Sequence, residues 1–281
     1  MKILFSVIAM LAMCSSAVAK APAVYGDVNG DGVVTTNDVT AIYNYLLFND
    51  MEFYSSCDVN SDGDITVADV TIIYQILLGI NIVDDSHEYV DLDLPSGTLW
   101  ATMNIGASTP EEFGDYFAWG ETTPKDVYDW STYQWCNGRW SKMTKYCTNP
   151  AHGDNGFTDD KTELDPEDDA ASVNWSSQWR MPSKEQLDEL RNQCTWTWTT
   201  SNGVKGYRVS KNGKSIFLPA AESYSGNILS SGNLGYYWSR TLGETTRYAY
   251  YLYFHSTSVT AEAFERSSGC TVRAVRVEGA K

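Results

Sequence analysis

Two acidic stretches of the sequence have the residue types and the spacing of calcium-binding loops. The first runs from Asp27 to Asp38 and the second from Asp58 to Asp69, so the copies are offset by 31 residues. In each copy, oxygen-bearing side chains stand at loop positions 1, 3, 5 and 12, and glycine stands at position 6. Calcium is a hard cation that takes roughly six to eight oxygen ligands, and a loop of about twelve residues supplies them at this spacing. Glycine suits the tight turn at position 6.

The predicted ligands occupy positions 1, 3, 5, 7 and 12 of each loop, and position 7 contributes its backbone carbonyl. They are Asp27, Asn29, Asp31, Val33 and Asp38 in the first loop, and Asp58, Asn60, Asp62, Asp64 and Asp69 in the second. Two such loops predict two bound calcium ions. Position 12 is Asp, whose side chain is one methylene shorter than that of Glu, so the following helix must approach the ion more closely. An Asp-, Asn- and Gly-rich stretch also forms ordinary turns, but that does not explain two copies in register.

Each loop is followed by the pattern of a helix with one apolar stripe. The stripes are Val39, Ile42, Tyr43, Leu46 and Leu47 in the first copy, and Val70, Ile73, Tyr74, Leu77 and Leu78 in the second. Thr35 and Thr66 are predicted N-caps, with Asp38 and Asp69 three residues on. No helical pattern leads into either loop. We therefore expect a small all-α unit in which each helix buries its stripe against its twin.

This repeated unit, residues 24–81, resembles the type I dockerin module, the calcium-dependent plug that docks into cohesin domains of polysaccharide-degrading assemblies. The resemblance implies a cohesin-like partner. In dockerins, loop positions 10 and 11 help to recognise that partner, and here they are Thr36-Asn37 and Val67-Ala68. Because the two pairs differ, the two faces of the module are not expected to be interchangeable.

The N-terminal end indicates export. Residues 1–19 combine a positive start, a short apolar run and an Ala-x-Ala ending, which predicts a signal peptide cut after Ala19. A lipoprotein signal at Cys14 is the alternative. The apolar run is too short for a membrane anchor, and no other stretch is long enough to span a bilayer. We therefore expect a secreted protein, extracellular or held at the cell surface, that does not span the membrane.

Charge and cysteine content narrow the function classes. The chain has 20 Lys and Arg against 36 Asp and Glu, a net charge of −16, which disfavours nucleic acid and anionic lipid as partners. Exported cysteines can pair, and Cys136–Cys147 and Cys194–Cys270 are candidate disulfides. No Cys or His spacing suggests zinc.

A linker at residues 82–87 leads into a second domain at residues 88–278, where strand-like runs alternate with turns. Asn212-Gly213 predicts a tight hairpin. Ser183 and Gln186 predict a capping box at the start of a helix that carries Leu187 and Leu190. This is an α+β pattern. The predicted strands are 89–94, 98–105, 207–209, 215–218, 248–254, 258–264 and 271–277.

Several strings of the second domain resemble the Fibrobacter succinogenes major paralogous domain, common in secreted proteins of gut Bacteroidetes. Among them are Leu94-Pro95-Ser96-Gly97-Thr98-Leu99-Trp100-Ala101, Phe113-Gly114-Asp115-Tyr116-Phe117-Ala118-Trp119-Gly120-Glu121, Trp179-Arg180-Met181-Pro182-Ser183, Gly235-Tyr236-Tyr237-Trp238-Ser239 and Thr271-Val272-Arg273-Ala274-Val275. The family is similar to the C-terminal domain of the Legionella collagen-like adhesin. The resemblance implies a C-type-lectin-like fold but no catalytic residue.

Two features of the second domain suggest binding chemistry. The chain has 10 tryptophans and 18 tyrosines, and exposed aromatic rings stack on sugars, although most such rings are expected in the core. Trp130, Trp135 and Trp140 lie in a polar stretch and are expected to be the more exposed ones. The acidic run 154–169 is either a solvated loop or an additional calcium site.

An enzyme needs a constellation that the sequence does not supply. A glycosidase needs two facing carboxylates, and Glu121, Glu222 and Glu262 have no motif that pairs them. We assign no catalytic residue and no organic cofactor. The sequence thus predicts a calcium-binding dockerin protein that presents a lectin-like binding or adhesion domain in polysaccharide degradation or surface attachment. The alternatives are a dockerin-bearing O-glycosyl hydrolase, or a dockerin that docks on its own C-terminal domain.

Overall fold

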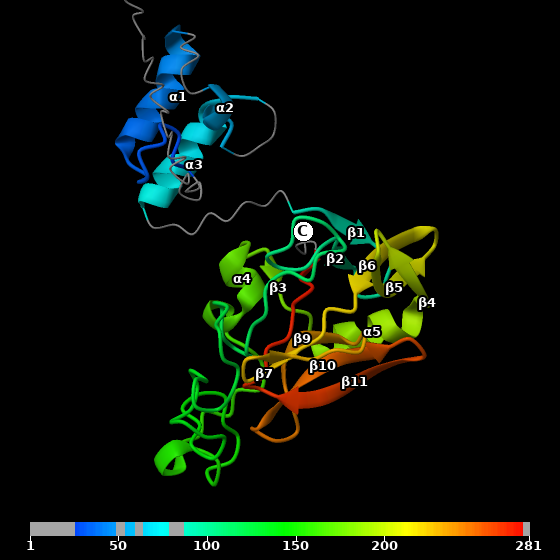
Figure 1. Cartoon of the computed structure of the whole chain (residues 1–281). Helices are drawn as coiled ribbons and strands as arrows, with labels where there is room; N and C mark the ends of the chain where they lie inside the picture. Colours follow the sequence, from blue (N-terminus) through cyan, green and yellow to red (C-terminus); the bar gives the residue numbers. More distant parts are fainter. Residues whose placement is uncertain (1–25, 49–53, 60–63, 79–86, 278–281) are drawn as a thin grey trace, which may run out of the picture. The chain divides into compact units, whose positions relative to one another are not determined.

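The computed structural model describes residues 26–48, 54–59, 64–78 and 87–277 (Figure 1). Contacts divide the chain into two compact units, Met1–Ile82 and Val83–Lys281, hereafter the first and second units. The predicted signal peptide lies outside the described residues, as does the linker except for His87.

In the first unit, helices α1 (Thr36–Phe48) and α3 (Val67–Leu77) each begin directly after an acidic loop. The hydroxyl of Thr66, the N-cap of α3, accepts the Ala68 N–H, and the capping box with Asp69 is complete. Thr35 Oγ1 accepts the Asn37 N–H at 3.1 Å in the same way. Both helices therefore start at the predicted threonines, because hydroxyl oxygens there satisfy backbone donors that a helix leaves unpaired.

A short helix, α2 (Tyr54–Cys57), leads into the second loop. The expectation that no helix precedes either loop is therefore wrong at this point. A single turn is too short to show a helical period in the sequence. Helix α2 is held in place by Cys57, which is fully buried in the core of the first unit.

The core of the first unit repeats with the period of the sequence. Val28 and its equivalent Val59 are 2% and 7% exposed, and Ile42 and Ile73 are completely buried. Val39 and Val70 complete the same cluster, and α1 packs against α3. Because both copies bury the same positions, they form near-equivalent halves of one small core.

Only part of each predicted stripe is buried. Tyr43 and Tyr74 are 38% and 45% exposed, and Leu47 and Leu78 are 69% and 74% exposed. The expectation that the whole stripe packs against the twin helix is wrong, because a contact between two helices covers only a narrow strip of each. An apolar strip on each helix is left on the surface.

The second unit is built from antiparallel sheets. Its first sheet has the order β1-β2-β12-β3, so strands from both ends of the unit pair in one sheet. The strands are β1 (Tyr89–Asp91), β2 (Thr98–Ala101), β3 (Trp179–Arg180) and β12 (Val275–Val277). The predicted closing strand 271–277 is therefore shorter, and Thr271 makes only an isolated bridge to Tyr237.

Two three-stranded sheets and a small hairpin follow. One sheet is β4-β5-β6, formed by Thr195–Ser201, Val204–Lys211 and Lys214–Pro219. The other is β11-β10-β9, formed by Ser258–Glu265, Tyr248–His255 and Gly235–Leu242. Strands β7 (Tyr224–Ser225) and β8 (Ile228–Leu229) make the small hairpin. Asn212 and Gly213 join β5 to β6 with φ of 51° and 81°, as a two-residue turn with two positive φ values requires.

Helix α5 (Lys184–Gln193) has the predicted capping box of Ser183 and Gln186, and it buries Leu187 and Leu190. Helix α4 (Ala170–Asn174) was not predicted. The part between β2 and α4 is mostly irregular, with the short 3-10 helices η1 (Asp154–Gly156) and η2 (Pro166–Asp168). Much of it forms one end of the second unit (green in Figure 1). The second unit thus combines antiparallel sheets with short helices.

Two buried arginines tie this irregular part to the sheets. The Arg266 guanidinium donates to the carbonyls of Tyr146 and Thr246 at 2.9 Å. Arg273 donates to Asn104 Oδ1 at 2.8 Å and to the carbonyl of Ala101 at 3.1 Å. Both side chains are almost completely buried, so carbonyl and amide oxygens replace the water that these charges lose.

Candidate functional site: the paired acidic loops

Asp27 organises the first half of the first loop. Its Oδ1 accepts the N–H groups of Gly30 and Asp31 at 2.8 and 3.1 Å, and its Oδ2 accepts the Gly32 N–H at 2.9 Å. Gly32, at position 6, has a φ of 92°, which glycine adopts without strain. The loop therefore turns tightly around the carboxylate at position 1.

The next predicted ligands are linked to each other. Asn29 Oδ1 accepts the Asp31 N–H at 2.9 Å, and Asn29 Nδ2 donates to Asp31 Oδ2 at 3.1 Å. Asp31 Oδ1 in turn accepts the N–H of Val33 at 3.0 Å. Hydrogen bonds therefore connect loop position 3 to position 5 and position 5 to position 7, which holds these residues within one short turn.

Asp38 closes the loop from the first turn of α1. It is completely buried, its Oδ1 accepts the N–H groups of Val28 and Asn29, and its Oδ2 accepts the N–H of Thr35. The carboxylate therefore links the entry of the loop to the start of the helix. Its negative charge also lies at the helix N-terminus, where the helix dipole favours it.

The second loop repeats this closure. Asp69 is completely buried, and it accepts the N–H groups of Val59 and Thr66 at 2.8 Å each. Asp58 and Asp64 are among the described residues, whereas Asn60 and Asp62 lie outside them. In its described residues, the second loop therefore has the same closing hydrogen bonds as the first loop.

The residues of the first loop fit a hard cation by their chemistry. They offer three carboxylates, one amide oxygen and one carbonyl, and an ionised carboxylate has about four lone-pair directions. Hydrogen bonds to backbone N–H groups therefore leave directions free for an ion. Within the described ranges, no three His, Cys, Asp or Glu side chains are gathered as a metal cluster.

The predicted recognition residues lie on the surface. Thr36 and Asn37 occupy the first turn of α1, and Val67 and Ala68 occupy the first turn of α3, and all are exposed. The exposed strip of each helix continues from them at the same repeat positions. It consists of Thr36, Thr40, Tyr43 and Leu47 on α1, and of Val67, Thr71, Tyr74 and Leu78 on α3.

Taken together, the first unit is a doubled calcium-loop-and-helix module. Residues 25–93 match the family model of the dockerin type I domain, so this part of the chain is a dockerin domain. The match extends beyond Ile82 and through β1 of the second unit. Dockerin domains bind calcium and dock to cohesin domains, and proteins that carry them are typically extracellular or on the cell surface.

No curated protein and no solved structure matches the chain. None of the described helices is both long and apolar enough to cross a membrane.

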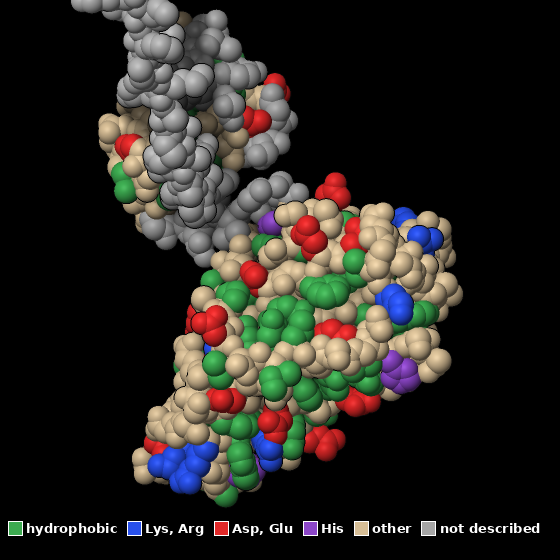
Figure 2. Space-filling view, in the orientation of Figure 1, with side chains coloured by type: hydrophobic (Ala, Val, Ile, Leu, Met, Phe, Trp, Pro, Cys, Tyr) green, Lys and Arg blue, Asp and Glu red, His purple; other side chains and the backbone are tan. Residues whose placement is uncertain are grey.

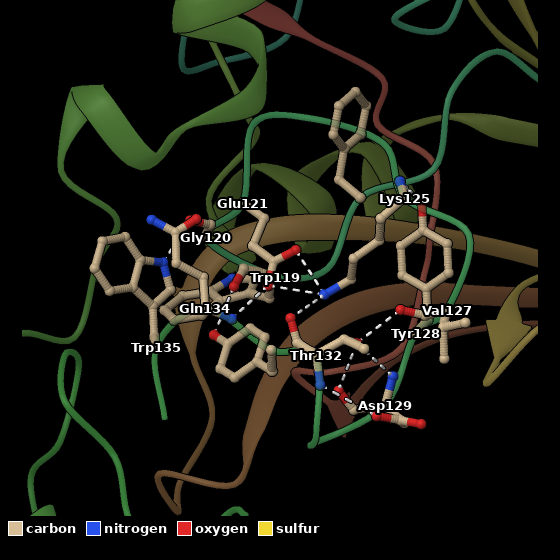
Figure 3. Close-up of polar contacts among 12 residues, drawn as sticks. Trp119, Gly120, Glu121, Lys125, Val127, Tyr128, Asp129, Thr132, Gln134 and Trp135 are labelled. Atoms are coloured by element: carbon tan, nitrogen blue, oxygen red, sulfur yellow. Dashed lines mark hydrogen bonds and ion pairs between the residues drawn. The ribbon is translucent and has the colours of Figure 1, made fainter. Parts of the chain in front are cut away.

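In the second unit, Glu121 belongs to a structural network (Figure 3). Its Oε2 pairs with Lys125 Nζ at 2.7 Å, and its Oε1 accepts the Gln134 N–H at 2.7 Å. Lys125 Nζ also donates to the carbonyl of Thr132 at 3.1 Å. This carboxylate therefore fixes the loop 121–134.

Glu222 holds another loop. Its Oε1 accepts the N–H groups of Gly232, Asn233 and Leu234 at 3.0, 2.6 and 3.2 Å. Its Oε2 accepts the Ser230 hydroxyl at 2.9 Å. Glu222 itself has a φ of 61°, an uncommon conformation for a residue with a side chain. No sequence pattern indicates this role, because the partners of the carboxylate are mainly backbone N–H groups, which every sequence has.

Glu262, the third carboxylate considered as a catalytic candidate, is exposed beside an aromatic face. Tyr236 on β9, Tyr253 on β10 and Phe264 on β11 are half-buried, with ring centroids 5.2 Å apart for Tyr236–Tyr253 and 5.5 Å for Tyr236–Phe264. Glu262 pairs across the strands with Tyr251, and burial together with this neighbouring carboxylate raises the pKa of Tyr251.

The tryptophans of the irregular part are more exposed than Trp100, Trp119, Trp175, Trp179 and Trp238, which are buried, but none of the three lies fully on the surface. Trp130, Trp135 and Trp140 are half-buried and pack against a cluster around Met143. Trp135 Nε1 donates to the carbonyl of Gly120 at 2.6 Å. Polar neighbours in the sequence did not predict this, because the segment folds back and forms its own small core.

The acidic run 154–169 is not a solvated loop throughout. Asp168 and Asp169 are buried, and Lys145 Nζ pairs with Asp168 at 2.5 Å and with Asp165 at 2.9 Å. Asp169 caps α4. These three carboxylates therefore have structural roles, because they neutralise a lysine and begin a helix.

The two candidate disulfides are not formed. Cys136, Cys147, Cys194 and Cys270 are all thiols. Cys194 and Cys270 pack in different core clusters. Cys136 Sγ instead contacts the carbonyl of Trp130 at 3.3 Å.

Proposed function

We propose that the protein is an exported, calcium-binding dockerin protein whose second unit presents a lectin-like binding or adhesion surface. Calcium would order the first unit for docking to a cohesin-like partner, in polysaccharide degradation or surface attachment. The observation that carries this proposal is the dockerin match together with its geometry, in which both loops close on a buried aspartate. The proposed location is the cell exterior or the cell surface.

Two calcium ions are proposed, one in each loop. In the first loop the ligands are Asp27, Asn29, Asp31, the Val33 carbonyl and Asp38, and the second loop uses the residues at equivalent positions. The buried Asp38 and Asp69 connect the ions to the helix starts. Ion binding would therefore directly affect the conformation of the exposed surfaces that begin at the N-termini of these helices.

The docking surface is proposed to be the exposed strip of α1 or of α3. Recognition starts at Thr36-Asn37 or Val67-Ala68 and continues along apolar side chains that are exposed in this structure, Tyr43 and Leu47 or Tyr74 and Leu78. Exposed apolar surface of this kind is typical of interaction sites. The different residues at the start of each strip would give the two strips different partner preferences.

For the second unit, we favour glycan binding on a C-type-lectin-like fold. The half-buried rings of Tyr236, Tyr253 and Phe264 offer faces for sugar stacking, and Glu262 offers a nearby acceptor for sugar hydroxyls. Figure 2 shows hydrophobic and acidic side chains gathered over the part of this unit where Figure 1 draws β9 to β11. The structural roles of Glu121 and Glu222 favour binding over glycoside hydrolysis.

Calcium titration calorimetry tests the first half of the proposal. The full chain should bind two ions, and Asp27→Ala and Asp58→Ala should each remove one. Capture of recombinant cohesin domains should then need calcium and fail after chelation. A chain that binds no calcium, or whose sites survive both substitutions, would overturn the proposed docking mechanism. Glycan-array binding of the full chain tests the second half.

A further inference from the structure

A polar cavity lies at one end of the aromatic face of the second unit. Its volume is about 240 Å³, and it is lined by Trp198, Lys205, Gly232, Asn233, His255 and Ser256. These residues come from three separate segments: the β4–β5 hairpin, the loop before β9 and the end of β10. The His255 ring lies 5.9 Å from that of Tyr253, so the cavity adjoins the aromatic face.

Trp198 supplies a fixed aromatic wall. Its ring packs edge-on against Tyr207 at 5.1 Å and against Phe254 at 6.4 Å. The side chain is half-buried, so part of the indole still borders the cavity. An indole held in this way offers an apolar surface on which a sugar ring can stack at little cost in side-chain entropy.

The polar lining carries one cation, Lys205, although the chain as a whole is acidic. Lys205 is exposed on β5, and none of the described carboxylates lies within ion-pair distance of its ammonium group. The lining adds His255, Ser256 and Asn233 and, among the described residues, contains no Asp or Glu. In a chain of net charge −16, this lining favours an anionic group over a neutral one.

The hydrogen bonds of His255 fit the same role. The N–H of Thr257 approaches His255 Nδ1 at 3.4 Å. Since a backbone N–H can only donate, Nδ1 accepts this contact, and Nε2 is the ring nitrogen left to donate. The Tyr207 hydroxyl donates to the His255 carbonyl at 3.1 Å, which holds this residue against β5. The imidazole thus offers a further hydrogen-bond donor.

The third wall is pre-organised by a buried carboxylate. Glu222 binds three consecutive N–H groups of the loop 232–234, so Gly232 and Asn233 are held beside the cavity. A site whose walls are fixed before binding loses less conformational entropy when a ligand arrives. Hydrogen bonds and ring packing therefore hold these walls of the cavity in place before a ligand arrives.

From this arrangement we infer that the cavity binds an acidic monosaccharide unit, a hexuronate or a similar carboxylated sugar. The sugar ring stacks on Trp198, and its carboxylate faces Lys205. The cavity is smaller than the roughly 300–1,000 Å³ of sites for drug-sized ligands, which suits one sugar ring, and the adjoining aromatic face would take the next. This inference rests on the proposed glycan-binding function and specifies its ligand class.

The test compares methyl glucuronide with methyl glucoside, which differ in the carboxylate. Both are titrated into the full chain, and binding is followed by the indole N–H resonance of Trp198, assigned with Trp198→Phe. The glucuronide should shift this resonance and bind at least about fivefold more tightly than the glucoside. Its affinity should fall as salt rises, because screening weakens the contact with Lys205.

Lys205→Gln should weaken glucuronide binding at least about fivefold. Arg208→Gln is the matched control, because it removes the same charge from an exposed position on the opposite face of the same strand. Equal binding of both sugars, or equal effects of both variants, would overturn the inference. Glycan-array binding that survives Lys205→Gln would leave the proposed function intact while placing the site elsewhere, whereas absence of all glycan binding would contradict both.

Discussion

Asp38 and Asp69 occupy equivalent places in the two halves of the dockerin domain. Each is completely buried, each accepts the N–H of the valine at loop position 2, and each accepts the N–H of the threonine at position 9. The residue that closes the predicted metal loop is therefore also the residue that starts the helix. If calcium binds as proposed, ion binding and helix stability are coupled through one side chain.

This coupling predicts that Asp38→Ala destabilises the first unit even without calcium. The substitution leaves buried N–H groups without an acceptor and removes half of the cap, so the free energy of unfolding should fall by about 2 kcal/mol. Denaturant unfolding in a chelating buffer, followed by helical circular dichroism, measures it. Asp31→Ala is the control, because this exposed loop residue should matter mainly when calcium is present. Equal losses for both variants in the chelating buffer would contradict the coupling.

Substitutions in the exposed strips should weaken docking without lowering the stability of the first unit. Tyr43→Ala and Tyr74→Ala remove rings that are 38% and 45% exposed, so each should change the free energy of unfolding by no more than about 0.5 kcal/mol. The variant on the strip that docks should lose about 2 kcal/mol of binding, a change of roughly thirtyfold in Kd. Binding to a panel of recombinant cohesin domains in calcium measures it.

Tyr89→Ala in the second unit is the matched control, since that tyrosine is also 45% exposed. Because the residues at positions 10 and 11 differ between the copies, Tyr43→Ala and Tyr74→Ala should not weaken docking equally. Equal losses would show that the two faces are interchangeable, contrary to the expectation from the sequence.

Local signals in the sequence predicted local structure well. The Asn212-Gly213 hairpin and the Ser183–Gln186 capping box are formed as expected, because neighbouring residues alone determine turn and cap geometry. Burial depends also on distant segments, and the predictions of burial were only partly correct. Trp135 became part of a small core, and half of each helix stripe stayed on the surface.

The residues that unite the second unit were also missed. Arginine is normally exposed, so nothing in the local sequence marked Arg266 and Arg273 as buried. Their partners are mainly backbone carbonyls from segments more than a hundred residues away, and backbone atoms leave no trace in a sequence pattern. The cavity beside Trp198 was missed for the same reason, because its walls come from three segments.

Arg273 carries the next prediction. Burial lowers its pKa to about 10, so it is still charged at neutral pH. Its guanidinium bonds the carbonyls of Ala101, Thr102 and Phe217 in addition to Asn104. Lysine cannot reproduce this fork of donors, so Arg273→Lys should lower the free energy of unfolding by about 3 kcal/mol. Denaturant unfolding monitored by tryptophan fluorescence measures it, and a loss no larger than that of exposed Arg208→Lys would contradict the proposed role.

Asp169 should make the stability of the second unit depend on pH. Burial raises the pKa of this carboxyl from 3.8 to about 6, against the lowering effect of the Met181 N–H and the other N–H groups that it binds. The folded state therefore retains a proton that the unfolded state has already lost. The resulting stabilisation is fully present below about pH 3.8 and is lost as the pH rises through about 6.

Asp169→Asn removes this titration while keeping an oxygen that can cap α4. The free energy of unfolding of the wild-type chain, relative to the variant, should fall by roughly 2.4 kcal/mol between pH 4 and pH 7. Urea unfolding of both chains at half-unit pH steps measures the difference, in which the other carboxylates cancel. Parallel curves would show that the three N–H groups that donate to Asp169 outweigh its burial and keep the folded pKa near its ordinary value.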